Sequence, residues 1–379
     1  MREARTKIRA QLRGAFGALR NYVSDADVRG KLFEKRDYQF INKAESLREL
    51  DVRFLTQGSF AYGTLIRPAR RWAQEIDLDD GIYVPMPFVD GRPVFSSEGL
   101  FEIMQRALEP LVTREGWKFK RKNTCIRITL VGKGAHIDLP LFAVDDTSFR
   151  RLAEMFERQT ETTFGKSANL NDTLDTIAKS VRLGSGQILL ADREEDWRPS
   201  DPKAIHDWFI ANVTRYGKVL RRLSRYAKAW RDDKWDDAAF SSLALMVLCV
   251  EALAALGERP SEDRDDLLLL AVAEHLPERI RRGSISWREG ERACDDEWSP
   301  EWREELAKAA ESFRDDVKAA LYDTFHSDVV IQKLRRALSD RIPNAPEAVV
   351  IAAAAQTAAV LETKAETVPM PRVGSSVSA

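Results

Sequence analysis

The chain has 379 residues, of which 44% are hydrophobic, so it is long enough for two lobes and apolar enough for a real core. Its 59 basic and 60 acidic residues nearly cancel, which excludes the basic surface of a general DNA- or RNA-binding protein. The three cysteines, Cys125, Cys249 and Cys294, are widely scattered and lack metal-ligand spacing, which predicts reduced thiols in a cytoplasmic protein.

Residues 1–50 are predicted to form helices that brace the next part of the chain. Apolar residues such as Ile8, Leu12 and Phe16 recur at helical spacing, with charged residues elsewhere. These charges interrupt residues 1–20 throughout, so no signal peptide is expected there.

A glycine–serine pair, Gly58 and Ser59, marks the start of a short predicted helix. Gly58 has no side chain, so a ligand can approach its backbone closely. Ser59 would lie at a helix N-terminus, where outward N–H groups favour anions. The pair alone is also typical of ordinary turns. With the carboxylates that follow, it predicts a seat for a triphosphate.

Two aspartates, Asp77 and Asp79, occupy alternate positions of a predicted strand. Side chains two residues apart emerge on the same face of a strand, so both carboxylates point one way while Leu78 points into the core. Alone, this acidic segment would indicate a solvated turn or a Ca²⁺-like loop.

A third aspartate, Asp138, lies on a second predicted strand. Residues 121–131 and 134–144 are expected to form a β-hairpin that follows a helix over residues 97–114. Within it, Asp138 alternates with the apolar Ile137 and Leu139, so it faces the opposite side and would lie beside Asp77 and Asp79.

Together the three aspartates predict a two-metal site for nucleotidyl transfer. Carboxylates hold Mg²⁺, and two such ions about 3.5 to 4 Å apart can activate a hydroxyl and neutralise a leaving pyrophosphate. Mn²⁺ could replace Mg²⁺. Asp77 and Asp79 are expected to bind both ions, and Asp138 to complete the catalytic one and help to remove the hydroxyl proton.

The next segments predict a crossing to a second, helical lobe. Residues 146–202 are expected to be a polar connector, and Ser200, Asp201 and Pro202 suit the cap and first turn of a long helix over about residues 204–230. The apolar run at residues 238–256 contains Glu251 and predicts a buried helix rather than a membrane span.

After further predicted helices in residues 263–361, the chain becomes polar and broken, and residues 362–379 are expected to form a flexible tail.

The motifs resemble those of the CD-NTase family, bacterial cyclic-oligonucleotide synthases that are related to animal cyclic GMP-AMP synthase and occur in anti-phage (CBASS) operons. The similarity is greatest to members that make cyclic GMP-AMP. It extends over most of residues 54–246 and is carried by these segments: 56–60, 75–81, 116–119, 136–140, 200–203 and 228–231.

The resemblance implies roles for residues whose pattern alone favours a structural one. Tyr62 would otherwise be a core aromatic but matches a tyrosine that stacks on the donor base. Arg127, otherwise a solvated strand residue, matches an arginine that faces the nucleotide. Lys228 and Ser242 match contacts to the donor phosphates. The remaining expected nucleotide-binding residues are Gln57, Gly58, Ser59, Ser200 and Asp201.

The resulting expectation is an α+β, two-lobed, polymerase-beta-like nucleotidyltransferase, with a mixed sheet core lobe and a helical C-terminal lobe. Its parts would be bracing helices in 1–50, the core lobe and connector in 51–200, the helical lobe in 201–361 and the tail in 362–379. It would join ATP and GTP, or other nucleoside triphosphates, into a cyclic dinucleotide with release of pyrophosphate. A template-independent RNA nucleotidyltransferase and a catalytically silent nucleotide-binding module are the alternatives.

The expected partners follow from the same resemblance. No membrane and no obligatory nucleic acid are required. Relatives encoded beside ubiquitin-transfer-like enzymes are conjugated to other proteins through flexible tails that end in a small residue. The tail ending at Ala379 fits this pattern.

Overall fold

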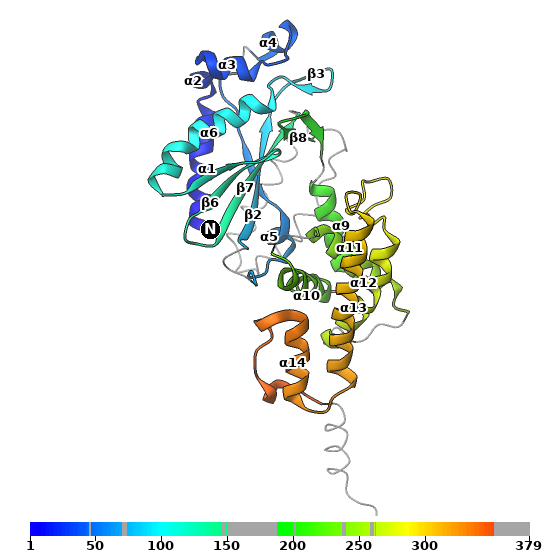
Figure 1. Ribbon diagram of the computed structural model, residues 1–379. Coiled ribbons are helices and arrows are strands. Elements are labelled where there is room, and N and C mark those ends of the chain that lie inside the picture. Colours follow the sequence, from blue (N-terminus) through cyan, green and yellow to red (C-terminus); the bar gives the residue numbers. More distant parts are fainter. Residues whose placement is uncertain are drawn as a thin grey trace, which may run out of the picture.

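The structure is a computed structural model that describes residues 1–44, 47–69, 74–145, 149, 188–200, 202–236, 240–257, 261 and 263–351. These residues form a sheet lobe and, from Pro202 onward, a helical lobe (Figure 1). Each lobe has its own hydrophobic core. The α+β class, with a mixed sheet followed by a helical lobe, is confirmed. The predicted tail and most of the predicted connector lie outside the described residues.

Among the residues that the structure describes, the sheet lobe begins with four helices and continues as a sheet with two further helices. Its helices are α1 (Arg2–Gly17), α2 (Leu19–Val23), α3 (Ala26–Leu32), α4 (Tyr38–Ala44), α5 (Gly58–Tyr62) and α6 (Ser97–Arg114). Its strands are β1 (Arg53–Thr56), β2 (Ile76–Pro85), β3 (Phe88–Val89), β4 (Arg92–Pro93), β5 (Lys118–Arg121), β6 (Cys125–Leu130), β7 (Ala135–Val144), β8 (Ile188–Asp192) and β9 (Asp196–Pro199).

The helical lobe consists of six α-helices and two short 3-10 helices among the residues described. They are α9 (Pro202–Tyr216), α10 (Val219–Lys234), α11 (Ser242–Ala255), α12 (Asp265–Arg282), α13 (Pro300–Tyr322), α14 (Ser327–Leu338), and the 3-10 helices Ser339–Arg341 and Pro346–Ala348. Helix α11 is the buried helix expected from the apolar run at residues 238–256. Within the described part of the chain, no helix is long and apolar enough to cross a membrane.

The main sheet has the order β1-β2-β7-β6-β5, and β8 and β9 extend it beside the far half of β7. Strands β2 and β7 run parallel, whereas the other pairs in the sheet are antiparallel. The predicted β6–β7 hairpin is confirmed, and its second strand lies directly beside β2. The central β2–β7 pair therefore carries all three predicted carboxylates.

Successive side chains of β2 and β7 point to opposite faces of the sheet, and the two faces differ in character. Leu78, Ile137 and Leu139 belong to the lobe's main core together with residues of α1 and α6. On the opposite side, Tyr83 stacks on Phe142 with ring centroids 4.8 Å apart. The carboxylates occupy the other end of that same side, because side chains two residues apart share a face. One half of the face is thus packed and the other half is polar.

Asp80 points to the side of the sheet that α1 covers. Its carboxylate is fully buried and forms an ion pair with Arg9 of α1, whose Nε lies 2.7 Å from Asp80 Oδ2. Thr56 Oγ1 also donates to Asp80, at 3.1 Å. Helix α1, one of the N-terminal helices predicted to brace the core, therefore contacts the strand that carries Asp77 and Asp79 directly.

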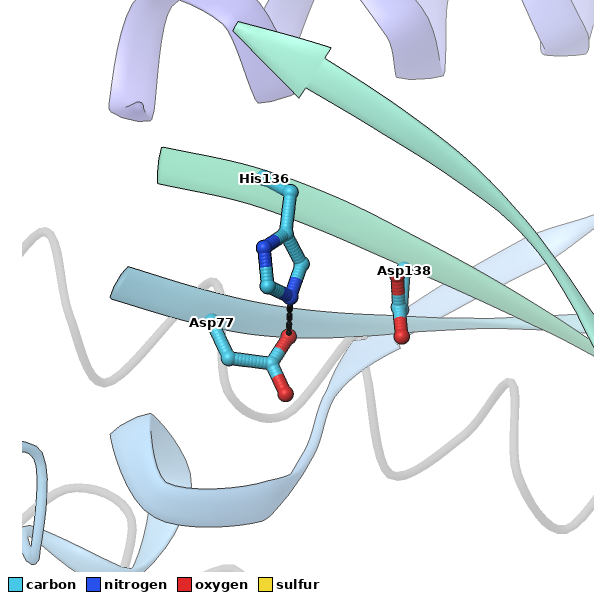
Figure 2. Close-up of side chains that lie close together, drawn as sticks. All are labelled: Asp77, His136 and Asp138. Carbon is cyan, nitrogen blue, oxygen red and sulfur yellow. Dashed lines mark ion pairs between the residues drawn. The ribbon is translucent and has the colours of Figure 1, made fainter. Parts of the chain in front are cut away.

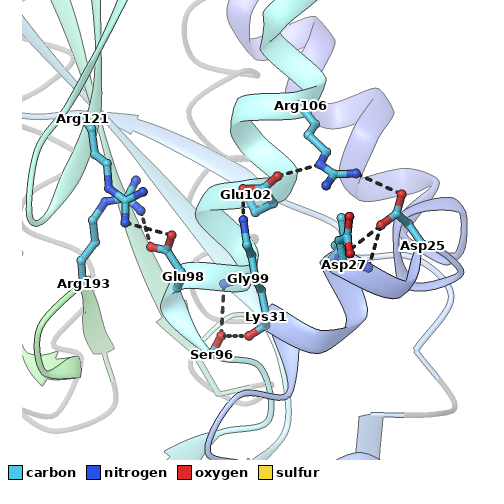
Figure 3. Close-up of polar contacts among 11 residues, drawn as sticks. Asp25, Asp27, Lys31, Ser96, Glu98, Gly99, Glu102, Arg106, Arg121 and Arg193 are labelled. Carbon is cyan, nitrogen blue, oxygen red and sulfur yellow. Dashed lines mark hydrogen bonds and ion pairs between the residues drawn. The ribbon is translucent and has the colours of Figure 1, made fainter.

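Helix α6 is fixed at its first turn by polar contacts on two sides (Figure 3). Ser96 Oγ caps the helix by accepting from the backbone N–H of Gly99 at 3.1 Å. On the sheet side, Glu98 pairs with Arg121 at 2.9 Å and with Arg193. These contacts fix the face of β5 that carries Arg121.

Three predictions about local structure are wrong. The single helix expected over residues 204–230 is two helices, because Gly217, with a φ of +89°, ends α9 before α10 begins. The first hairpin strand begins at Cys125 rather than Arg121, and Lys118–Arg121 forms the separate strand β5. Part of the expected polar connector is the β8–β9 hairpin, whose turn is held by Asp192 Oδ1 accepting from two backbone N–H groups.

Candidate active site

The three predicted carboxylates meet at one end of the β2–β7 pair. Asp79 lies directly opposite Asp138 in the parallel register, and Asp77 lies opposite His136. Figure 2 shows Asp77 and Asp138 reaching from neighbouring strands toward the same space, with His136 beside them. The expectation that Asp138 lies beside the first carboxylate pair is confirmed.

His136 is a member of the site that the sequence reasoning missed. Its Nδ1 lies 2.8 Å from Glu75 Oε2 and its Nε2 lies 3.0 Å from Asp77 Oδ1, so it bridges the two carboxylates. The signal was present, because a residue two positions before Asp138 on a strand must share its face. His136 therefore sets the position of Asp77.

The donor set fits a metal ion. One ligand atom from each of Asp77, His136 and Asp138 lies within 4.8 Å of the others. Asp77 Oδ1 is buried and its contact in the described residues is the ion pair with His136 Nε2, so a cation bound there would share this oxygen with the histidine. Asp79 belongs to the same face, but its Oδ2 lies beneath Gly58 of α5.

Like charges crowd this end of the sheet. Burial, together with the charges of Asp77 and Asp138, raises the pKa of Asp79 to about 7. Burial alone would raise the pKa of Asp77, but contact with His136 outweighs it and the pKa is lowered. Burial likewise opposes protonation of His136, yet the Asp77 contact raises its pKa. A bound cation would relieve the repulsion that these shifts report.

Arg127 on β6 holds Asp138 with two parallel hydrogen bonds. Its Nε donates to Oδ1 at 2.6 Å and its Nη2 donates to Oδ2 at 2.7 Å. This two-point pairing fixes the carboxylate plane, which a lysine could not do. Arg127 was expected to face the nucleotide, and it does line the cavity described below while it orients Asp138.

Helix α5 approaches the carboxylates closely at Gly58. Gly58 has a φ of +63°, and a Cβ added there would lie 1.9 Å from Asp79 Oδ2. The backbone N–H of Gln57 donates to the carbonyl of Asp79 at 2.8 Å, which ties the helix start to β2. Gly58 was expected to let a ligand approach its backbone; the group that the structure brings close to it is the carboxylate of Asp79.

Lys228 of α10 reaches across to α5. Its Nζ donates to Ser59 Oγ at 2.7 Å and to the carbonyl of Thr64 at 3.0 Å. The residue is 4% exposed, and burial, with the charge of Arg231, lowers its pKa to about 8. Ser59 and Lys228 were predicted from separate parts of the sequence, and the structure brings them together between the lobes.

Arg231 is a second cation that the sequence reasoning did not single out. It lies three residues after Lys228 on the same helix, and its Nη1 donates to Ser242 Oγ at 3.2 Å. It also pairs with Asp232 at 2.7 Å. The Ser242 hydroxyl accepts from Arg231, so its own proton can be donated to a phosphate oxygen.

A cavity of about 500 Å³ joins these groups and lies between the lobes. Its polar lining residues are Ser59, Gln74, Glu75, Asp77, Lys120, Lys122, Arg127, His136, Lys228, Arg231, Asp232, Asp236 and Ser242. Carboxylates therefore face cations from both the sheet and α10 across one space.

The other expected nucleotide-binding residues have different places. Gln57 does not line this cavity, and its side-chain amide donates to the Tyr83 hydroxyl. Tyr62 packs on α9, with ring centroids 5.7 Å from His206 and 5.6 Å from Phe209. Ser200 lies just beyond β9, away from the cavity lining. Asp201 lies outside the described residues.

Two family models match the chain. The model described as cyclic GMP-AMP synthase DncV-like, nucleotidyltransferase domain, matches residues 52–142, and the model of the cyclic GMP-AMP synthase C-terminal domain matches residues 217–351. A cyclic GMP-AMP synthase of Vibrio cholerae is 36% identical over 241 residues, which cover 62% of this chain and 54% of the relative. One from Escherichia coli is 35% identical over 283 residues, covering 69% and 60%. The chain thus spans little more than half the length of these relatives.

Solved structures give a more extensive match. The Vibrio cholerae dinucleotide cyclase DncV in complex with GTP and 5MTHFGLU2 superposes with a TM-score of 0.74 at 27% identity, covering 93% of this chain and 92% of that one. The Vibrio cholerae enzyme with the linear intermediate 5′ pppA(3′,5′)pG gives 0.72 at 27% identity, covering 93% and 91%. Escherichia coli DncV bound to 3′-deoxy GTP gives 0.70 at 25% identity, covering 91% and 90%.

Proposed function

The chain belongs to the CD-NTase family of DncV-like nucleotidyltransferases, and from this premise we propose that it joins ATP and GTP into a cyclic dinucleotide such as cyclic GMP-AMP. The observation that carries the proposal is the cluster of Asp77, Asp79 and Asp138 on the β2–β7 pair, whose member Asp77 lines one cavity with Ser59 and Lys228. Carboxylates on one wall suit metal ions, and cations on the other suit a triphosphate.

The reaction consists of two equivalent couplings. In each, a ribose hydroxyl oxygen of the acceptor forms a bond to the α-phosphorus of the donor, the bond from that phosphorus to the bridging oxygen breaks, and pyrophosphate leaves. The hydroxyl proton passes to Asp138 and from there to water. The first coupling gives a linear intermediate that still has a 5′-triphosphate. The second closes it into a ring and releases the second pyrophosphate.

We assign Asp77, Asp79 and Asp138 as the residues that would hold two Mg²⁺ ions. These ions would supply Lewis-acid polarisation of the phosphate and a lowered pKa for the attacking hydroxyl. The clustering of ligand atoms from Asp77, His136 and Asp138 within 4.8 Å and the raised pKa of Asp79 support this assignment. His136 and Glu75 keep Asp77 in place, and Arg127 does the same for Asp138.

The donor triphosphate would lie between the lobes. Lys228 supplies a point charge, and the hydroxyls of Ser59 and Ser242 donate to phosphate oxygens. Gly58 lets α5 approach the β2 carboxylates, so that the phosphate seat and the metal site are adjacent. In this division the core lobe and connector expected in residues 51–200 would hold the metals, and the helical lobe expected in residues 201–361 would complete the nucleotide seat.

The decisive experiment incubates the purified protein with all four nucleoside triphosphates and Mg²⁺ or Mn²⁺, followed by phosphatase and mass spectrometry. A phosphatase-resistant cyclic dinucleotide is expected, and Asp77→Asn/Asp79→Asn should abolish it. Asp90→Asn, in the turn after β3, is the matched control and should keep full activity.

The other possible products separate the alternatives. A ladder of longer products would instead indicate an RNA nucleotidyltransferase. If the protein formed neither a cyclic dinucleotide nor longer products, and did not bind nucleotides, the non-enzyme alternative would be favoured.

The cellular setting is a proposal of the same kind. A role in anti-phage signalling and a cytoplasmic location are consistent with the family and with the three free cysteines, Cys125, Cys249 and Cys294. Conjugation of the tail by ubiquitin-transfer-like enzymes stays a prediction from the sequence.

A further inference from the structure

Two lysines that line the cavity have no role in the chemistry described so far. Lys120 lies on β5, and Lys122 is the first residue after that strand. Both line the same cavity as Asp77 and Arg127. Within the described part of the chain, neither ammonium group forms an ion pair with a carboxylate. In contrast, the guanidinium of Arg127 is committed to Asp138. The uncommitted positive charge on this side of the carboxylates therefore comes from Lys120 and Lys122.

The register of the sheet fixes where these lysines lie. Lys120 pairs with Arg127, Arg127 pairs with Asp138, and Asp138 pairs with Asp79, so the four residues form one transverse row across four strands. Figure 3 shows the neighbouring residue Arg121 turned to Glu98 at the start of α6, on the other side of the strand. By alternation, Lys120 is directed to the face that carries the carboxylates.

The cations of the cavity thus form two groups with the carboxylates between them. Lys228 and Arg231 lie on α10, and Lys120 and Lys122 lie beside the opposite edge of the sheet. A coupling of two nucleoside triphosphates needs two polyphosphate seats, because the acceptor keeps its own triphosphate while its hydroxyl attacks the donor. Lys228 of the α10 group is already assigned to the donor, and Arg231 is paired with Asp232.

We propose that Lys120 and Lys122 bind the 5′-triphosphate of the acceptor nucleotide during the first coupling. This inference rests on the proposed function. Lysine is suited to the task, since a flexible, compact charge can follow a polyphosphate whose position differs between acceptors.

The two lysines should serve one coupling and not the other. In the first coupling, the acceptor is a nucleoside triphosphate. In the second, the attacking hydroxyl belongs to the end of the linear intermediate that has no triphosphate, and the triphosphate at its other end must occupy the donor seat at Lys228. The lysine pair is then free of polyphosphate.

The test compares both couplings in Lys120→Ala/Lys122→Ala. The first is isolated with a 2′,3′-dideoxy donor triphosphate, which has no hydroxyl to close the ring, in both base combinations of ATP and GTP. The second is isolated with synthetic linear intermediate. The KM for the acceptor should rise about 10- to 100-fold, as for loss of two charge-assisted contacts. Cyclisation of the linear intermediate should stay within about twofold of wild type.

Lys118→Ala is the matched control, because Lys118 is an exposed lysine two residues before Lys120 on β5 and does not line the cavity. It should leave both couplings unchanged, and Lys120→Arg/Lys122→Arg should recover the acceptor KM. Equal losses in both couplings, or no loss in either, would overturn the inference while leaving the enzyme activity established. A wild-type protein that catalyses neither coupling would overturn the proposed function, and the inference with it.

Discussion

Replacing Gly58 with alanine should separate catalysis from folding. The added Cβ would lie 1.9 Å from Asp79 Oδ2, whereas real Cβ atoms essentially never approach another heavy atom within 3.0 Å. Asp79 or the start of α5 must therefore move by about 1 Å, well beyond the roughly 0.5 Å tolerance of a catalytic constellation. A displacement of that size costs about 100-fold in rate. We expect kcat/KM for cyclic product to fall by about that factor.

The part of the folding cost that comes from backbone conformation can be measured separately. Alanine in the left-handed region, at the φ of +63° found here, costs about 1 to 2 kcal/mol. Gly116 is the matched control, because it has a φ of +67° with no atom within 4 Å of an added Cβ. Gly116→Ala should lose about this free energy of unfolding in urea titrations, without the further cost of the Asp79 clash, and should keep its activity. Equal activities in the two variants would refute the claim that Gly58 is required for the approach to Asp79.

Three further predictions concern charge at the site. Burial lowers the pKa of Lys228 to about 8, so its positive charge is lost as the pH rises through that value. The KM for the donor nucleotide in steady-state assays should therefore increase from about pH 7 to about pH 9. A constant KM would contradict this. Mg²⁺ should raise the melting temperature of the wild-type protein by relieving carboxylate repulsion, and should have little effect on Asp79→Asn in the same thermal scans. Arg127→Lys removes the two-point contact with Asp138 and should lower kcat about 10- to 100-fold with little change in donor KM; a change in KM alone would assign Arg127 to ground-state binding.

Periodicity was sufficient to predict helix α6 and the β6–β7 hairpin of the sheet lobe. The common face of Asp77 and Asp79 followed from their spacing alone, whereas the place of Asp138 on that face depends on the parallel register of β2 and β7. The same rule would have placed His136 on this face. It was overlooked because a single histidine in an apolar strand carries no charge pattern of its own.

Other features depend on contacts that no local pattern encodes. The break at Gly217 interrupts a continuous amphipathic pattern, and its positive φ becomes evident only once α9 and α10 take different directions. The β8–β9 hairpin is rich in charge, and Asp192 and Arg193 are engaged with groups distant in sequence. The Lys228–Ser59 contact joins residues 169 positions apart, which spacing cannot reveal.

The ion pair between Arg9 and Asp80 bears on where the protein can be shortened. The matched nucleotidyltransferase region starts at residue 52, which invites a truncated form beginning there. Such a form would lack α1 and leave the fully buried Asp80 without its guanidinium, a loss of about 3 to 5 kcal/mol, on the strand that carries Asp77 and Asp79. It would also uncover the core surface that Leu12 and Phe16 cover. The smallest independently stable catalytic unit must therefore include the first helix.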